Sequence, residues 1–387
     1  MAGSMRTSTG DGEAARRRHP ISAAVVAVCR ATTPSLPATE PVRRGFVDAV
    51  RHHRVAPLAH VLLRDDDPDL AAVLKVDRDA AMIRHLTAGV VLGQLSTSLG
   101  ELPWATVKGP VLSEYAHPAP GLRTYTDVDV LVAPGELRTA ARRLLDAGWQ
   151  VIDFRDMLCN VETPGEMHLV SPAGVLVDLH WSLINMSPTR RRFSVDTEQL
   201  LGRRRTVSVA GSATWTLDAA DSLVHVCLHA ALTGAHKMIW LLDADQLARR
   251  TERWDDVVDR ALAWGAGPAV ALVLARARAV LGTPLPADLD RRLGISTGFR
   301  LVTATVDRLR PVPRLRRDAS IPRLVARSVR STGGRTLTTL GTRSLRGLTD
   351  RLRVTGARSG PPAVREPADG EAVEKYLSAV EAQVATP

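Results

Sequence analysis

Three aspartates lie in segments whose residue patterns predict β-strands. Asp127 and Asp129 are two residues apart in a strand predicted over 127–132, and Asp178 lies in a strand predicted over 175–181. Alternate residues of a strand share a face, so Asp127 and Asp129 point the same way while the intervening valines point into the core. Carboxylates held side by side repel each other, and a divalent cation compensates that repulsion. If the two strands are neighbours, the three aspartates predict a metal site for in-line displacement at phosphorus.

A Lys-Gly turn and an arginine add groups suited to phosphate. Lys108-Gly109 separates a β-prone run, 104–107, from a short helix predicted from Val111. The backbone N–H groups of such a turn and the lysine ammonium are donors for phosphate oxygens. Arg123 precedes the Asp-x-Asp strand, and its planar guanidinium could clamp a triphosphate. An Asp-x-Asp pair alone is common in surface turns, whereas this combination is far more specific.

Histidines accompany the carboxylates on the predicted strands. His180 is two residues from Asp178 and shares its face, where it could orient an acceptor, move a proton or contact phosphate. A hydrogen-bonded core histidine is the alternative for His180. His168, on the partner strand of a predicted hairpin, has a similar but weaker claim.

A second group of histidines lies on and after a predicted helix. His225 and His229 are four residues apart on one face of it, and His236 and Lys237 follow its end. A His-x-x-x-His pair can bind Zn²⁺, but the Glu of a His-Glu-x-x-His protease is absent because residue 226 is valine. Lining of a substrate cleft and hydrogen bonding between domains both stay open for this group.

The order of helical and strand-like patterns indicates the fold class. A β-turn-α-β-α-β-β-β unit in the middle of the chain is typical of an α/β or α+β fold, and helical patterns precede and follow it. An amphipathic helix predicted over 371–385 is suited to docking or to a homodimer contact. The expected segments are 1–20 disordered, 21–100 helical, 101–185 the α/β core, 186–290 helical, and 291–387 an Arg-rich tail with the amphipathic helix.

Positive charge is concentrated in one segment. The 387 residues carry a formal net charge of +10, yet residues 291–358 alone hold 17 arginines and three aspartates. Such a stretch can bind an acidic partner, or it can be a solvated tail. Phe299 is its single aromatic residue, so it offers little for stacking bases and nucleic-acid binding is not expected.

Cysteine usage and the length of apolar runs indicate the cellular compartment. Cys29, Cys159 and Cys227 are far apart and form no C-x-x-C pair, which argues against a disulfide scaffold and favours a reducing compartment. The apolar run 21–29 is too short to span a bilayer and lacks the cleavage site of a signal peptide. We therefore expect a cytoplasmic protein without a transmembrane segment.

Four motifs characterise the middle of the chain. They are Thr106-Val107-Lys108-Gly109-Pro110-Val111-Leu112, Arg123-x-x-x-Asp127-x-Asp129-x-Leu131-Val132, Gly148-Trp149 and Asp178-Leu179-His180-Trp181. In these motifs the sequence resembles the uncharacterised nucleotidyltransferase family, within the DNA polymerase β-like nucleotidyltransferase superfamily. The superfamily usually has Gly-Ser where this chain, like the family it resembles, has Lys108-Gly109.

The resemblance implies a small mixed β-sheet flanked by helices. It also implies metal-dependent transfer of a nucleoside monophosphate from an NTP, with release of pyrophosphate. Asp127 and Asp129 would bind Mg²⁺ or Mn²⁺, Asp178 would be a third ligand or the base for an acceptor hydroxyl, and His180 would join this catalytic set. The residues expected to bind the nucleotide are Lys108, Gly109, Arg123, Tyr125, His229, His236 and Lys237.

The resemblance leaves the acceptor open among small molecules, peptides and proteins. Members of the family occur beside genes for modified peptides, so tailoring of a ribosomal peptide is a narrower hypothesis. Two alternatives belong to other classes of function. One is a non-catalytic binding module that uses the fold and the basic segment 291–358, and the other is a phosphotransferase on the same scaffold.

Overall fold

The computed structural model describes residues 20–154, 157–314, 320–330, 332, 334–339 and 365–385. The segment predicted to be disordered, 1–20, lies outside these residues except for Pro20. The Arg-rich stretch, 291–358, is described only in part, as far as residue 339.

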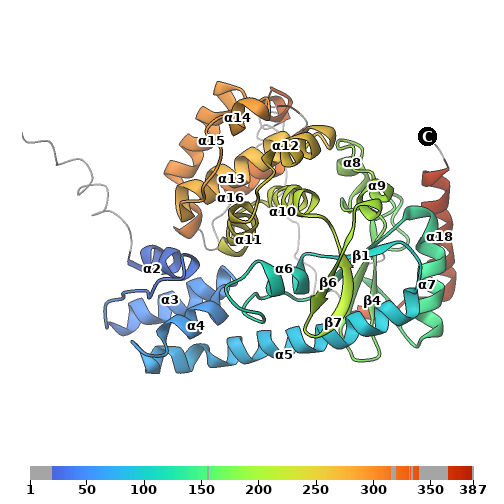
Figure 1. Ribbon diagram of the computed structural model, residues 1–387, viewed down its shortest axis with the longest axis horizontal. Helices are drawn as coiled ribbons and strands as arrows, with labels where there is room; N and C mark the ends of the chain where they lie inside the picture. The colour runs from blue at the N-terminus through green and yellow to red at the C-terminus, as the bar shows by residue number, and fades with distance from the viewer. Residues whose placement is uncertain are drawn as a thin grey trace, which may run out of the picture.

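Helices form the N-terminal part of the described chain, as its apolar spacing predicts. They are α2 (Pro20–Cys29), α3 (Glu40–His52), α4 (Ala56–Leu63) and α5 (Pro68–Leu99). Helix α5 runs along the lower edge of the molecule in Figure 1 and continues through Gly89. A Cβ atom at Gly89 would lie 2.8 Å from the Cβ of Ala210, so glycine allows the helix to pack closely against a neighbouring hairpin.

An eight-stranded mixed sheet lies beside these helices. In spatial order its strands are β6 (Arg205–Val209), β7 (Ser212–Thr216), β1 (Trp104–Val107), β2 (Val128–Val132), β5 (Leu176–His180), β4 (Glu166–Val170), β3 (Gln150–Phe154) and β8 (Arg365–Pro367). Strands β2 and β5 are parallel, as are β1 and β7, and the other neighbours are antiparallel. This confirms the expected α+β fold with a mixed sheet. Strands β6, β7 and β8 extend the sheet beyond the segment 101–185.

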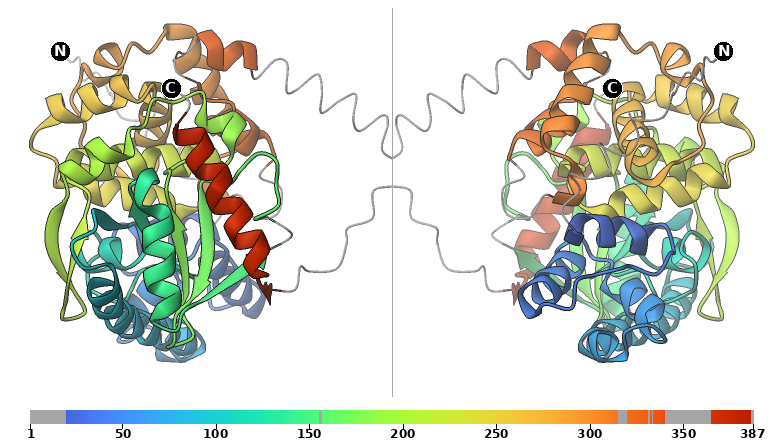
Figure 2. Two further views of the ribbon diagram at one scale, coloured as in Figure 1. Left: turned by 90° about the vertical axis from the view of Figure 1, so that its right-hand side faces the viewer. Right: turned by 90° about the vertical axis from the view of Figure 1, so that its left-hand side faces the viewer.

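One face of the sheet is covered by α7 (Leu137–Asp146) and α18 (Gly370–Val384), which lie side by side in Figure 2. Valine and leucine side chains of β2, β4 and β5 pack there with both helices and with α5 in one apolar core. Helix α18 is the amphipathic helix predicted over 371–385, and its apolar stripe is buried against this core. The apolar stripe of α18 therefore packs against the sheet of its own chain.

The C-terminal helices lie above the other part of the sheet in Figure 1. The remaining helices are α6 (Gly109–Tyr115), α8 (Ser187–Arg190), α9 (Thr197–Gly202), α10 (Ala219–Thr233), α11 (Met238–Arg249), α12 (Trp254–Ala263), α13 (Gly267–Leu281), α14 (Leu289–Arg292), α15 (Thr297–Leu309) and α16 (Ser320–Arg327), with 3₁₀ turns at Pro134–Glu136 and Val312–Arg314. Within the described residues, no helix has both the length and the apolar composition to cross a bilayer.

Candidate functional site

Five polar side chains project from one face of three neighbouring strands. In the register of the sheet, Asp129 of β2 lies beside Asp178 of β5, and His168 of β4 lies opposite Asp178. Another such pair on this face is His180 of β5 and Glu166 of β4. The residues between them are apolar and belong to the core under α7 and α18, as strand alternation requires. The pairing of the Asp129 strand with the Asp178 strand, on which the predicted site depends, is confirmed.

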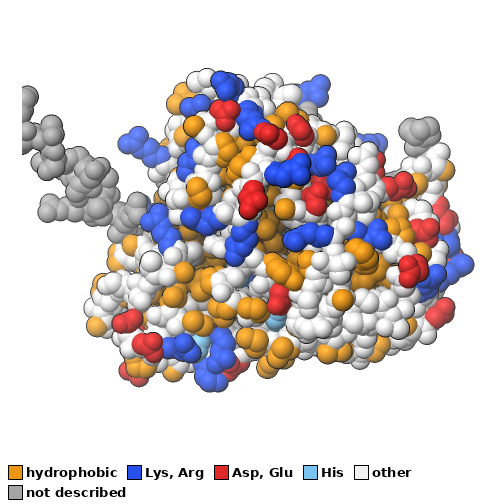
Figure 3. Space-filling model, viewed as in Figure 1, with side chains coloured by type: hydrophobic (Ala, Val, Ile, Leu, Met, Phe, Trp, Pro, Cys, Tyr) orange, Lys and Arg blue, Asp and Glu red, His pale blue; other side chains and the backbone are white. Residues whose placement is uncertain are grey.

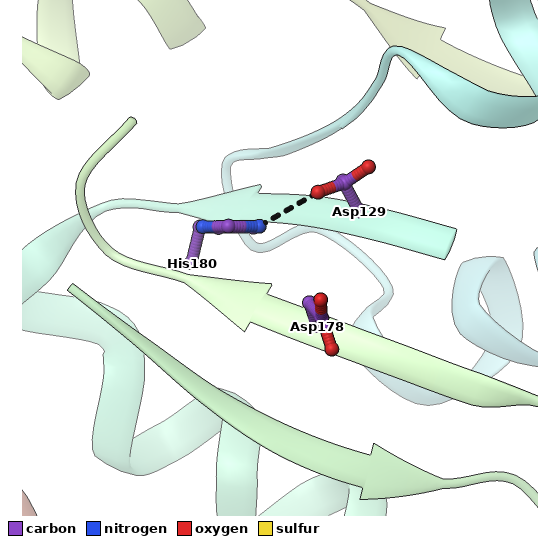
Figure 4. A group of neighbouring side chains, drawn as sticks. All are labelled: Asp129, Asp178 and His180. Atoms are coloured by element: carbon purple, nitrogen blue, oxygen red, sulfur yellow. Dashed lines mark hydrogen bonds and ion pairs between the residues drawn. The ribbon is translucent and has the colours of Figure 1, made fainter. Parts of the chain in front are cut away.

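Asp129 lies at the centre of a charged network. Its Oδ1 atom is 2.7 Å from the Nζ atom of Lys108 and accepts a hydrogen bond from His180 Nε2 at 2.9 Å (Figure 4). Burial disfavours the charged carboxylate, but Lys108 and His180 outweigh burial and hold the pKa of Asp129 well below its usual range. Asp129 is therefore ionised at neutral pH and already compensated by a lysine.

Asp178 and Glu166 each bind a histidine. His168 Nδ1 donates a hydrogen bond to Asp178 Oδ1 at 2.7 Å, and His180 Nδ1 lies 3.1 Å from Glu166 Oε2. Burial lowers the pKa of each imidazole, but the neighbouring carboxylates outweigh burial and raise the pKa values of both. The sequence analysis missed Glu166. Its place on the same strand face as His168, two residues earlier, is the signal that could have identified it.

Asp127 lies at the open end of the network. It directly precedes β2, so the strand begins one residue later than predicted. The Thr126 hydroxyl donates a hydrogen bond to Asp127 Oδ2 at 3.1 Å. Burial raises the pKa of Asp127, and the charges of Asp129 and Asp178 raise it further. This mutual repulsion is the feature that a bound cation would relieve.

Possible metal-ligating atoms gather at two overlapping places. Ligand atoms of Asp129, Asp178 and His180 lie within 4.8 Å of one another, and so do those of Glu166, His168 and Asp178. Asp127 belongs to neither group among the described residues. Carboxylate oxygens suit Mg²⁺ and Mn²⁺, and imidazole suits several transition metals. The ligand atoms of both groups therefore suit a divalent cation, and Asp178 belongs to both groups.

The Lys-Gly turn brings Lys108 to this network. Lys108 lies between β1 and α6 and has a φ of 53°, which is uncommon for a residue with a side chain. A Cβ atom at Gly109 would lie 3.2 Å from the carbonyl oxygen of Asp127, tighter than most such contacts, so this position favours glycine. The turn thus packs Gly109 directly against the segment that carries Asp127.

Arg123 is paired rather than open. Its Nε atom donates a hydrogen bond to Oδ1 of Asp243 in α11, and its Nη2 atom donates one to Oδ2, each at 2.8 Å. His117 Nε2 lies 2.8 Å from the same carboxylate, and all three side chains are buried. The sequence did not predict this pair, because no local spacing links two residues so far apart in the chain. A triphosphate contact by Arg123 stays a prediction.

Tyr125 also lies in a buried network. Its ring contacts the place where a Gly109 side chain would begin, and its hydroxyl lies 3.3 Å from His85 Nδ1. His85 Nε2 is 2.8 Å from Glu114 Oε2 in α6. These contacts tie α5 and α6 to the chain entering β2. Nucleotide contact by Tyr125 stays a prediction.

Helix α10 carries two histidines close to the network. Burial, together with the nearby charge of Lys108, lowers the pKa of His229 to about 3. Burial and Lys108 likewise hold the pKa of His225 well below its ordinary value. Both imidazoles are therefore neutral at pH 7. This position agrees with the cleft-lining interpretation of the pair.

The model of the uncharacterised nucleotidyltransferase family matches residues 43–282. The chain belongs to this family. The match covers more than half of the chain and includes every strand residue of the network described above. No curated protein matches the chain. Membership confirms the resemblance found in the motifs and supports nucleotidyl transfer with an NTP as substrate.

Two residues predicted to bind nucleotide lie apart from the carboxylates of the network. His236 stacks edge-on against Trp240, with ring centroids 5.0 Å apart. The charges that act on His236 and Lys237 come from arginines and other basic groups rather than from Lys108 or Asp129. Their contact with the NTP stays a prediction, and their surroundings form a separate cluster.

Proposed function

We propose that the protein transfers a nucleoside monophosphate from an NTP to a hydroxyl or similar group of a small-molecule, peptide or protein acceptor, with Mg²⁺ or Mn²⁺ bound at the carboxylates. The observation that carries this proposal is the pairing of Asp129 with Asp178 on parallel strands, beside Lys108. Two carboxylates and an ammonium on one strand face match the needs of a polyphosphate bound with a cation.

Asp127, Asp129 and Asp178 would hold the cation. When bound, the cation neutralises charge on the phosphates and stabilises the charge that develops at the reacting phosphorus. Lys108 compensates Asp129 in the unliganded protein. We propose that this ammonium contacts phosphate oxygens once a cation shares the Asp129 charge.

The raised pKa of His180 favours the protonated imidazole. A protonated imidazole donates to a phosphate oxygen and does not abstract a proton, so His180 is suited to bind and not to act as the base. Asp178 is the better candidate to accept the acceptor proton, because His168 holds it in place through a 2.7 Å hydrogen bond. His229 and Tyr125 would line the nucleotide side of the cleft.

A label-transfer experiment separates the proposal from a phosphotransferase. The purified protein is incubated with Mg²⁺, a small-molecule and peptide extract as acceptor source, and ATP labelled at either the α- or the γ-phosphate. Transfer of the α-label, absent in Asp178→Asn and in EDTA, supports nucleotidyl transfer. Transfer of the γ-label alone identifies a phosphotransferase and contradicts the proposal.

A further inference from the structure

A second cluster of basic side chains lies where three helices meet. Arg54 follows the end of α3, Lys237 precedes α11 and Arg323 lies in α16. His53 joins the first two elements, since its carbonyl accepts from the Ile239 N–H at 3.2 Å. In Figure 1, α3 lies below α11, and in Figure 3 lysine and arginine side chains lie along the border between the N-terminal and C-terminal helices. We call Arg54, Lys237, Arg323, His53 and His236 the second basic cluster.

These cations have no acidic partner within the part of the chain that the structure describes. Arg54, Lys237 and Arg323 are each only partly exposed, and none of them forms an ion pair with a described residue. Arg54 and Arg323 both lie close enough to Lys237 for their charges to act on it. Burial lowers the pKa of Lys237 and these two charges lower it further. Like charges gathered in a partly buried place are unfavourable unless an anion binds among them.

Polar atoms in the cluster also lack partners. The Nε atom of Arg323 and the Nδ1 atom of His236 are both buried, and neither has a hydrogen-bond partner among the described residues. His236 is 8% exposed. Buried donors without partners are rare in folded proteins and point to a missing acceptor.

Gly234 brings these two groups together. Its φ is 113°, and a Cβ atom there would lie 2.8 Å from Cγ of Arg323 and 3.2 Å from Nδ1 of His236. The side chain of Arg323 and the unpartnered imidazole nitrogen therefore face the same glycine. A residue with a side chain would displace Arg323, so the close approach depends on glycine.

The positive end of α11 lies at the same place. The helix begins after Lys237 without a side-chain cap, and its Met238 N–H donates to His53 Nδ1 at 3.3 Å. The positive end of a helix favours an anion. Burial lowers the pKa of His53 to about 3 and that of His236 to about 4, so both rings are neutral donors or acceptors at pH 7.

We propose that the second basic cluster binds a phosphate group, at a site separate from the carboxylate network. The two sites are linked by α10, because His229 lies near Lys108 and His236 follows the helix end at Thr233. The phosphate belongs either to the NTP or to a phosphorylated acceptor.

Calorimetry of the full chain with inorganic phosphate at low ionic strength tests the site. We expect binding by the wild type, at least a tenfold weaker affinity in Lys237→Gln/Arg323→Gln, and unchanged affinity in Lys75→Gln/Arg253→Gln, whose side chains are 61% and 82% exposed. Because the first pair removes repulsion, its melting temperature without phosphate should not fall. Phosphate should raise the melting temperature of the wild type but not of this variant.

Further titrations identify the source of the phosphate and keep the two sites apart. Asp129→Asn should bind inorganic phosphate as the wild type does, whatever happens to nucleotide binding. Competition between phosphate and Mg-ATP assigns the site to the NTP, and simultaneous binding assigns it to a phosphorylated acceptor. Absence of phosphate binding at millimolar concentration, or equal affinity in Lys237→Gln/Arg323→Gln, overturns the proposal.

Discussion

At the scale of single residues, the site is a balance of buried charges. Asp129 would be unfavourable beside Asp127 and Asp178 if Lys108 did not lie 2.7 Å from it. The lysine side chain is 13% exposed and the aspartate side chain 8%, so water screens the pair poorly. Removal of one partner of such a pair costs more than the pair itself contributes.

Lys108→Met should therefore lower the free energy of unfolding, by about 3 kcal/mol. Chemical denaturation with and without Mg²⁺ measures this loss. Mg²⁺ should restore part of it, because the cation takes over the compensation of Asp129. Lys75→Met is the matched control, since Lys75 is mostly exposed in its pair with Asp79 and should change stability little. A Lys108→Met protein as stable as the wild type, or unresponsive to Mg²⁺, would contradict this account.

Much of the residue-scale site could be predicted from the sequence. Alternation placed Asp127 and Asp129 on one side of a strand, and the hairpin pattern placed His168 and Asp178 together. Strand alternation places Glu166 on the face of His168, but its pairing with His180 depends on the register between β4 and β5, and Glu166 was missed. The same reason explains why the partner of Arg123 was not predicted.

At the scale of elements, α10 places neutral histidines beside the charged network. The unfolded chain binds a proton at His229 near pH 6.5, whereas the folded chain does so only near pH 3. As pH falls below 6.5 the unfolded state takes up the proton first, so the free energy of unfolding decreases. For one such group the decrease is about 1.4 kcal/mol per pH unit.

His229→Gln should reduce the loss of stability between pH 6 and about pH 4 relative to the wild type. Urea denaturation at a series of pH values gives the two slopes. The slopes should converge above pH 7, where His229 is neutral in both states. Identical slopes below pH 6 would show that His229 accepts its proton as readily in the folded chain as in the unfolded one.

Helix α18 is held against the sheet by a buried hydroxyl and by ion pairs at the surface. The Tyr376 hydroxyl donates to the Pro164 carbonyl at 2.7 Å and accepts from Trp181 Nε1 at 3.0 Å, and both partners flank the strands of the site. Arg138 of α7 forms surface ion pairs with Glu374 and Glu381 of the same helix. The buried hydroxyl should matter more than these exposed pairs.

Tyr376→Phe should cost about 1–2 kcal/mol of unfolding free energy, because it leaves the buried Trp181 N–H with one acceptor fewer. Arg138→Ala should cost less, and its effect should shrink further in high salt. Denaturation of both variants in low and high salt makes the comparison. A larger loss in Arg138→Ala would mean that the charges, and not the buried contacts, hold α18.

At the scale of the whole molecule, the sequence predicted the order of elements in the central unit and the helices around it, but not that β6, β7 and β8 join its sheet from segments expected to be helical or a tail. Strands β6 and β7 join the sheet beside β1 although more than 90 residues separate them from it in the chain. Local patterns identify such strands, whereas their partners depend on packing far along the chain. Gly89 of α5 shows the same limit, because the close approach that favours glycine there comes from Ala210, between β6 and β7.

The buried Arg123–Asp243 pair connects the chain before β2 with the C-terminal helices. Asp243→Asn should leave the buried Arg123 charge uncompensated and lower the free energy of unfolding by about 3–5 kcal/mol. It should also weaken NTP binding, because Arg123 is four residues from Asp127. Denaturation and calorimetry on the variant test both effects. An Asp243→Asn protein with the stability and the NTP affinity of the wild type would show that the pair contributes to neither.

The most direct test of the central claim is calorimetry with each NTP, in Mg²⁺ and in EDTA, on the wild type and on Asp129→Asn/Asp178→Asn. Asp146→Asn, at the end of α7, serves as the control. The account predicts NTP binding by the wild type and the control in Mg²⁺, and its loss in EDTA and in the double variant. NTP binding of equal strength in all these conditions, or no binding of any NTP by the folded wild type, would contradict a metal and nucleotide site on these carboxylates.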